Sequence, residues 1–69
     1  MEQIQIKDTY IRLCDALKLS GAADTGGMAK MMILDGLVAV NGEVCLMKGK
    51  KLAPGDQISL QGEIYEIVL

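Results

Sequence analysis

Histidine, tryptophan and phenylalanine are all absent from this sequence of 69 residues. Without an imidazole, the chain lacks the usual general base and the commonest metal ligand, which excludes most hydrolases and most zinc sites. Tyr10 and Tyr65 are the only aromatic residues, so aliphatic and methionine side chains must form the core, and base stacking on an aromatic platform is nearly ruled out. We therefore expect no enzymatic activity, no bound metal and no cofactor.

Cysteines and long apolar runs are also scarce. Cys14 and Cys45 form no C-x-x-C motif and have no partners that could hold zinc, so we expect two reduced thiols that fill the core. No stretch approaches the roughly 20 apolar residues of a membrane span. The first residues lack the charged and then apolar layout of a secretion signal. The sequence predicts a cytoplasmic protein without a membrane segment.

The composition is that of a folded domain. Hydrophobic residues make up 51% of the chain and charged residues 23%, which is ordinary for a globular protein and far from the composition of a disordered one. The length fits one small domain, so we expect residues 1–69 to form a single domain. Nine acidic residues against seven basic ones give a net charge of -2. This balance argues against unselective coating of nucleic acid, but it permits a local basic patch.

The hydrophobic pattern predicts a short strand followed by a helix. Alternation of polar and apolar residues over residues 2–6 indicates a half-buried strand at the edge of a sheet. A first helix is expected from about Tyr10 to Lys18, with Asp8 or Thr9 as its N-cap. Its buried stripe would consist of Tyr10, Leu13, Cys14 and Leu17.

A second helix follows a linker of small residues. Asp24 or Thr25 can cap its first amides, and its inward face would consist of Ala29, Met32 and Ile33. Gly36 marks its end, because the left-handed position after a helix favours a residue without a Cβ.

The rest of the chain alternates with a period of two and is broken by turn sequences. Asn41-Gly42 predicts a hairpin with a type I′ turn, and further turns are expected at Pro54-Gly55 and Gln61-Gly62. The order of strand, helix, helix and several strands predicts an α+β fold, with two helices packed on one side of a small antiparallel sheet.

Three groups of residues are candidates for binding an anionic partner. The start of the second helix has unpaired amides and the positive end of the helix dipole, and its glycine pair either admits a phosphate or simply makes a tight turn. A lysine-rich loop and the exposed cations of the helices could form a positive patch, although solvation explains each cation taken singly. The candidates are Arg12, Lys18, Thr25, Gly26, Gly27, Lys30, Lys48, Lys50 and Lys51.

The run from Arg12 to Ile58 resembles the S-four-type RNA-binding domain, also called the alpha-L motif. The matching residues are Arg12-Leu13, Leu17, Ala29-Lys30, Ile33, Gly36, Val38-Ala39-Val40-Asn41-Gly42 and Gly55-Asp56 with Ile58. The glycine pair and the lack of a catalytic domain are most similar to the short, free-standing bacterial members of the YbcJ/YaaA type.

The resemblance implies a protein that binds structured RNA, ribosomal or transfer RNA, without catalysing a reaction. It implies that Arg12 and Lys30 face RNA and that Thr25 occupies the small hydroxyl position before the second helix. The chain departs from the family at Gly26 and Leu37, where basic residues are frequent, and in its acidic balance. A second hypothesis is therefore a protein-interaction module that kept the fold without RNA affinity, and that uses the glycine pair, Met31 and the strand edges.

Overall fold

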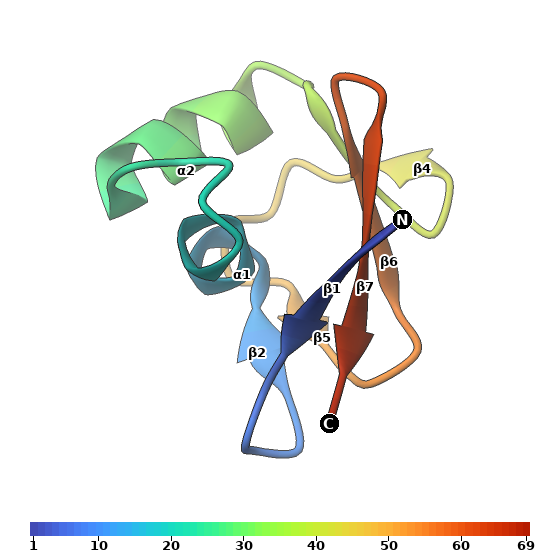
Figure 1. Ribbon diagram of the computed structural model, residues 1–69. Helices are drawn as coiled ribbons and strands as arrows, with labels where there is room; N and C mark the ends of the chain where they lie inside the picture. Colours follow the sequence, from blue (N-terminus) through green and yellow to red (C-terminus); the bar gives the residue numbers. More distant parts are fainter.

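Two helices and seven short strands make up the computed structural model, which describes residues 1–69. The elements are β1 Glu2–Gln5, β2 Ile11–Arg12, α1 Leu13–Leu19, α2 Gly26–Leu34, β3 Val38–Val40, β4 Glu43–Val44, β5 Lys51–Leu52, β6 Gln57–Leu60 and β7 Glu63–Val68. Both helices lie on one side of the sheet (Figure 1). The α+β class and the packing of two helices on a small sheet are confirmed.

Five strands form the main sheet in the order β1-β7-β6-β3-β4, so the expected edge position of the first strand is confirmed. β7 and β6, β6 and β3, and β3 and β4 pair antiparallel, as the hairpin turns require. β1 instead runs parallel to β7, with Ile4 opposite Ile67. The sheet is therefore mixed rather than purely antiparallel, because the first strand pairs with the last one and not with a hairpin neighbour.

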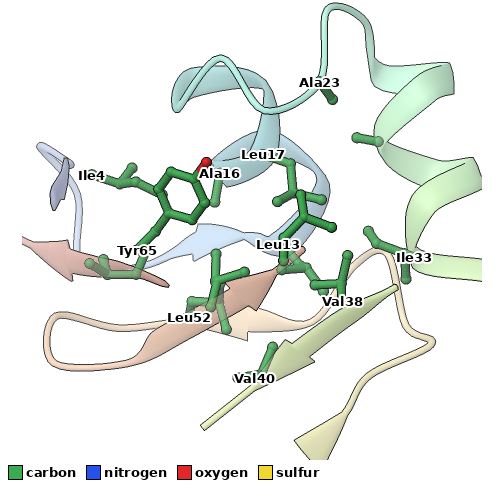
Figure 2. Close-up of a cluster of buried hydrophobic side chains, with 14 of the residues drawn as sticks. Ile4, Leu13, Ala16, Leu17, Ala23, Ile33, Val38, Val40, Leu52 and Tyr65 are labelled. Carbon is green, nitrogen blue, oxygen red and sulfur yellow. The ribbon is translucent and has the colours of Figure 1, made fainter. Parts of the chain in front are cut away.

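Fifteen buried hydrophobic side chains form one core between the helices and the sheet. Leu13 and Leu17 of α1 gather with Ile33 of α2 and Val38 of β3 (Figure 2). The Tyr65 ring lies near Ile4 and Ala16 at the other end of this cluster. Burial raises the pKa of the Tyr65 hydroxyl above its ordinary value, and the charges of Glu2 and Glu63 raise it further.

The turn and capping signals of the sequence are present in the structure. Thr25 is the cap of α2, since its hydroxyl oxygen accepts a hydrogen bond of 3.1 Å from the Met28 amide. Gly36 has φ +78° after the last helical turn. Positive φ at Asn41-Gly42, Gly55 and Gln61-Gly62 confirms the three turns. Cys14 and Cys45 are free and pack, partly buried, against the core.

The start of the first helix is not where the sequence placed it. α1 begins at Leu13, and Arg12 is its N-cap residue without a side-chain capping bond. Ile11 and Arg12 instead form β2, which pairs antiparallel with β5. Backbone pairing with a segment about forty residues away overrides the helical spacing that favoured Tyr10. Asp8 and Thr9 therefore cap no helix, and Tyr10 lies outside α1.

Candidate nucleic-acid interface

A groove of about 510 Å³ lies between the start of α2 and the loop before β5. Three cationic side chains line it, from Arg12, Lys30 and Lys48, and none of its lining residues is acidic. The remaining lining residues are Cys14, Gly26, Gly27 and Gly49. The fold thus brings five of the nine predicted site residues together at one groove of a protein that is acidic as a whole.

The start of α2 contributes backbone amides to this groove. Thr25 satisfies the third amide of the helix, that of Met28. The amides of Gly26 and Gly27 belong to the first turn, where an N–H has no carbonyl partner within its own helix. Both residues line the groove. Two residues with free amides and the positive end of the helix dipole therefore border the same space as the cations.

Packing within the chain does not explain the two glycines. Neither has positive φ. A Cβ on Gly26 would come no closer than 3.7 Å to another group, the Lys18 side chain, and a Cβ on Gly27 no closer than 3.9 Å, to the Thr25 hydroxyl. Both distances are ordinary contacts. The tight turn between the helices therefore does not require glycine here, whereas an approaching anion gains from amides that no side chain shields.

The lysine-rich loop is held against α1 by its backbone. The first amides of α1 donate to this loop, Leu13 to the Lys50 carbonyl at 2.9 Å and Cys14 to the Lys48 carbonyl at 3.0 Å. These bonds satisfy helix amides that lack a side-chain cap. The loop position is therefore fixed by main-chain bonds, and the lysine side chains project from it as exposed groups.

The other predicted site residues lie around the groove or apart from it. Lys18 lies beside Gly26 on the neighbouring helix. Lys51 pairs with Arg12 across the β2–β5 ribbon. Lys50 lines a different cavity, together with Glu43 and Val44, so the structure separates it from the groove. An RNA contact by each of these residues stays a prediction.

Tyr10 is a neighbour of the groove that the sequence placed in the core. It is 40% exposed, and Lys51 Nζ lies 4.9 Å from the centroid of its ring. The sequence had no signal for this position, because it depends on the pairing of β2 with β5.

The structure contains no helix with the length and hydrophobicity of a membrane span. It also contains no group of three or more His, Cys, Asp or Glu side chains that could hold a metal ion.

Two similar proteins have names that refer to RNA binding or to ribosome maturation. The chain is 37% identical over 62 residues to the Escherichia coli protein named "Putative RNA-binding protein YbcJ", an alignment that covers 90% of this chain and 89% of YbcJ. It is 37% identical over 59 residues to the Bacillus subtilis protein named "Probable ribosome maturation protein RlbA", with coverage of 86% and 83%.

Two solved structures have a fold similar to that of this chain. The solution structure of Escherichia coli YbcJ, described as an alpha-L motif involved in RNA binding, superposes with a TM-score of 0.76 at 34% identity and covers 100% of this chain and 89% of YbcJ. The 30S ribosomal protein S4e of Thermoplasma acidophilum superposes with a TM-score of 0.66 at 31% identity, over 87% of this chain and 32% of S4e. Residues 4–68 match the family model described as the S4 domain. The chain belongs to the S4 domain family and resembles its short bacterial members of the YbcJ type.

Proposed function

We propose that this protein binds structured RNA, ribosomal or transfer RNA, through the sugar-phosphate backbone and without catalysing a reaction. The groove between α2 and the lysine-rich loop is the site. Its cations meet phosphates as charges, and its two free amides donate hydrogen bonds to phosphate oxygens. Base reading contributes little at this groove, because backbone amides and flexible lysines do not distinguish bases.

The observation that carries this proposal is the uneven distribution of charge over the protein surface. A chain with a net charge of -2 gathers Arg12, Lys30 and Lys48 around one groove without a carboxylate among its lining residues. A site for a metal ion or a cationic peptide would need the opposite charge. The names of YbcJ and RlbA support an RNA ligand and point toward ribosomal RNA.

Binding of labelled ribosomal RNA and transfer RNA across a salt series tests the proposal. Each neutralised phosphate contributes about −0.7 to −0.9 to the log–log slope of affinity against salt, so three contacts predict a slope of roughly −2 to −3. We expect binding at low salt and release as the salt concentration rises. Absence of binding at low salt, or binding that salt does not weaken, would contradict the proposal.

A protein-interaction module is the second candidate, and one surface favours it. Ala39, Val44, Ser59 and Ile64 lie in register across four strands, on the face of the sheet opposite the helices. Val44 is 64% exposed and Ile64 is 39% exposed. Exposed apolar groups on a face of this kind are typical of protein contacts. These four residues form the outer sheet face.

Amide chemical shifts separate the two candidates. RNA should shift the amides of Gly26, Gly27 and Lys30 together with those of the lysine-rich loop, and should leave the outer sheet face unchanged. If RNA produces no shift at the groove even at low salt, and only strand edges respond and only to protein, the protein-interaction function replaces RNA binding.

A further inference from the structure

Tyr10 lies on the exposed face of the two-stranded ribbon formed by β2 and β5. Ile11 pairs with Leu52, and Arg12 pairs with Lys51. Leu52 is fully buried and Ile11 packs against the core. Because alternate residues of a strand point to opposite faces, Tyr10 shares the outward face with Arg12 and Lys51. The ribbon thus presents one aromatic ring and two cations on the same face.

Lys51 contacts this ring. Its Nζ lies 4.9 Å from the ring centroid of Tyr10, a distance at which an ammonium group is attracted to the face of an aromatic ring. The contact covers one face of the ring, and Tyr10 as a whole remains 40% exposed. A ring held in this way can stack a second flat group on its other face at a small cost in conformational entropy.

A cavity of about 910 Å³ borders the ring and adjoins the groove. Its basic lining residues, Lys7 and Arg12, are matched by two acidic ones, Asp8 and Asp15. Arg12 also lines the groove at the start of α2, which makes the two spaces neighbours. A cavity that contains carboxylates suits an uncharged planar group better than a phosphate, whereas the adjoining groove suits the phosphate.

The low aromatic content argued against base stacking, but Tyr10 lies on the surface and not in the core. We propose that Tyr10 is a stacking platform for one unpaired nucleobase of the RNA whose backbone lies in the groove. This inference rests on the proposed function and extends it, because it adds a base contact to a surface that otherwise meets phosphates. Every base presents a π-face, so the contact selects unpaired nucleotides over paired ones and is tolerant of their sequence. Lys51 is a positioning residue for the ring.

The test uses an RNA hairpin with a single-stranded loop and the same hairpin with abasic loop nucleotides. In protein with isotopically labelled tyrosine rings, the loop bases should shift the ring protons of Tyr10 upfield by their ring current. Tyr65 is an internal control, because it is buried near Ile4 and Ala16 (Figure 2) and should not move. The abasic hairpin should bind through its phosphates and leave the Tyr10 signals close to their free positions.

Affinities of two variants provide a second readout. Tyr10→Leu should weaken binding of the intact hairpin by about fivefold or more, the loss typical of one stacked base. Its salt slope should equal that of the wild type, because no phosphate contact is removed. Tyr10→Phe should restore the affinity, since stacking needs the ring and not the hydroxyl.

Two outcomes overturn the inference while RNA binding stands. One is salt-dependent saturation of the intact hairpin without a shift of the Tyr10 ring. The other is equal affinity of Tyr10→Leu and wild type for that hairpin, with the variant shown to be folded by its thermal midpoint. If neither hairpin binds at low salt, the proposed function fails and the stacking platform fails with it.

Discussion

The groove and the outer sheet face are two surfaces of one small molecule with opposite chemistry. The groove has three cationic side chains, two free amides and no acidic lining residue. The outer sheet face consists of alanine, valine, serine and isoleucine, and the only charged residue next to it on the same side of β7 is acidic, Glu66. A net charge of -2 describes neither surface. The lesson is that affinity for an anion depends on where the fold places its cations, and not on their total number.

Removing two groove cations should reduce RNA affinity more than any other change and so test the contrast between the two surfaces most strongly. We expect Arg12→Ala combined with Lys30→Ala to weaken RNA binding by at least about tenfold, because hydrogen bonds to charged groups contribute strongly. The salt slope should fall in magnitude by roughly 1.4 to 1.8, the contribution of two phosphates. Filter binding across a salt series measures both quantities. An unchanged slope would mean that these side chains do not touch phosphates.

Gly36 connects the two surfaces, since its turn leads the chain from α2 into β3. Gly36→Val should destabilise the fold by about 1–2 kcal/mol, because a residue with a Cβ is strained in the left-handed region and Gly36 has φ +78°. For a domain of this size, each kcal/mol lowers the thermal midpoint by about 4–8 °C. RNA affinity measured well below the midpoint should stay unchanged, because Gly36 is not a lining residue of the groove. A normal midpoint would show that the turn tolerates a side chain.

Lys48 and Lys50 form a matched pair that locates the boundary of the groove. Lys48 lines the groove, whereas Lys50 lines the cavity beside Val44. Lys48→Ala should lower RNA affinity severalfold and reduce the salt slope by about 0.7–0.9, and Lys50→Ala should change neither. Both substitutions keep the backbone carbonyls that anchor the loop to α1, so thermal midpoints should agree with the wild type. Equal losses of RNA affinity in the two variants would mean that a lysine contributes in the same way inside and outside the groove.

Gly27→Ala tests whether bare amides contribute to the groove beyond its cations. The new Cβ would lie 3.9 Å from the Thr25 hydroxyl, so the fold should gain about 0.4–1 kcal/mol from the lower entropy of the unfolded chain. RNA affinity should fall by a few-fold, because the methyl group shields an amide that donates to phosphate. Chemical denaturation and RNA titration of the same sample give the two values. A variant that is more stable and binds RNA as well as the wild type would mean that the amides do not contribute to RNA binding.

A substitution on the outer sheet face should have the smallest effect. Val44→Thr keeps the branched shape that suits a strand, and exposed substitutions usually change stability by less than about 0.5 kcal/mol. RNA affinity and its salt dependence should equal those of the wild type. A loss of RNA binding would show that this surface also contacts RNA and would remove the contrast between the two surfaces.

The sequence predicted the parts of the fold that depend on neighbouring residues. The Thr25 cap, the glycine after α2 and the Asn41-Gly42 turn follow from local backbone preferences, and all three are present. The pairing of β2 with β5 and the parallel pairing of β1 with β7 join distant segments. No local pattern encodes such partners, and helical spacing therefore placed Tyr10 in a helix that begins three residues later.

The sequence likewise indicated the residues of the candidate site but not their arrangement in space. Residue types and charge indicated the glycine pair and the cations, because unshielded amides and positive side chains suit phosphate wherever they meet. Their grouping was beyond the sequence, since Arg12, Lys30 and Lys48 come from three separate segments. The separation of Lys50 from Lys48 depends on the direction of two side chains in one loop, which charge counting does not resolve.

The parallel pairing of β1 with β7 has a consequence for synthesis on the ribosome. β7 lies between β1 and β6 in the sheet, so the first strand has no partner until the last strand has emerged from the exit tunnel. Closing so long a loop is slow relative to local hairpin formation. Cotranslational folding should therefore yield the helices and the central hairpin early, and the nascent chain should remain sensitive to protease at its N-terminal strand until β7 has left the tunnel.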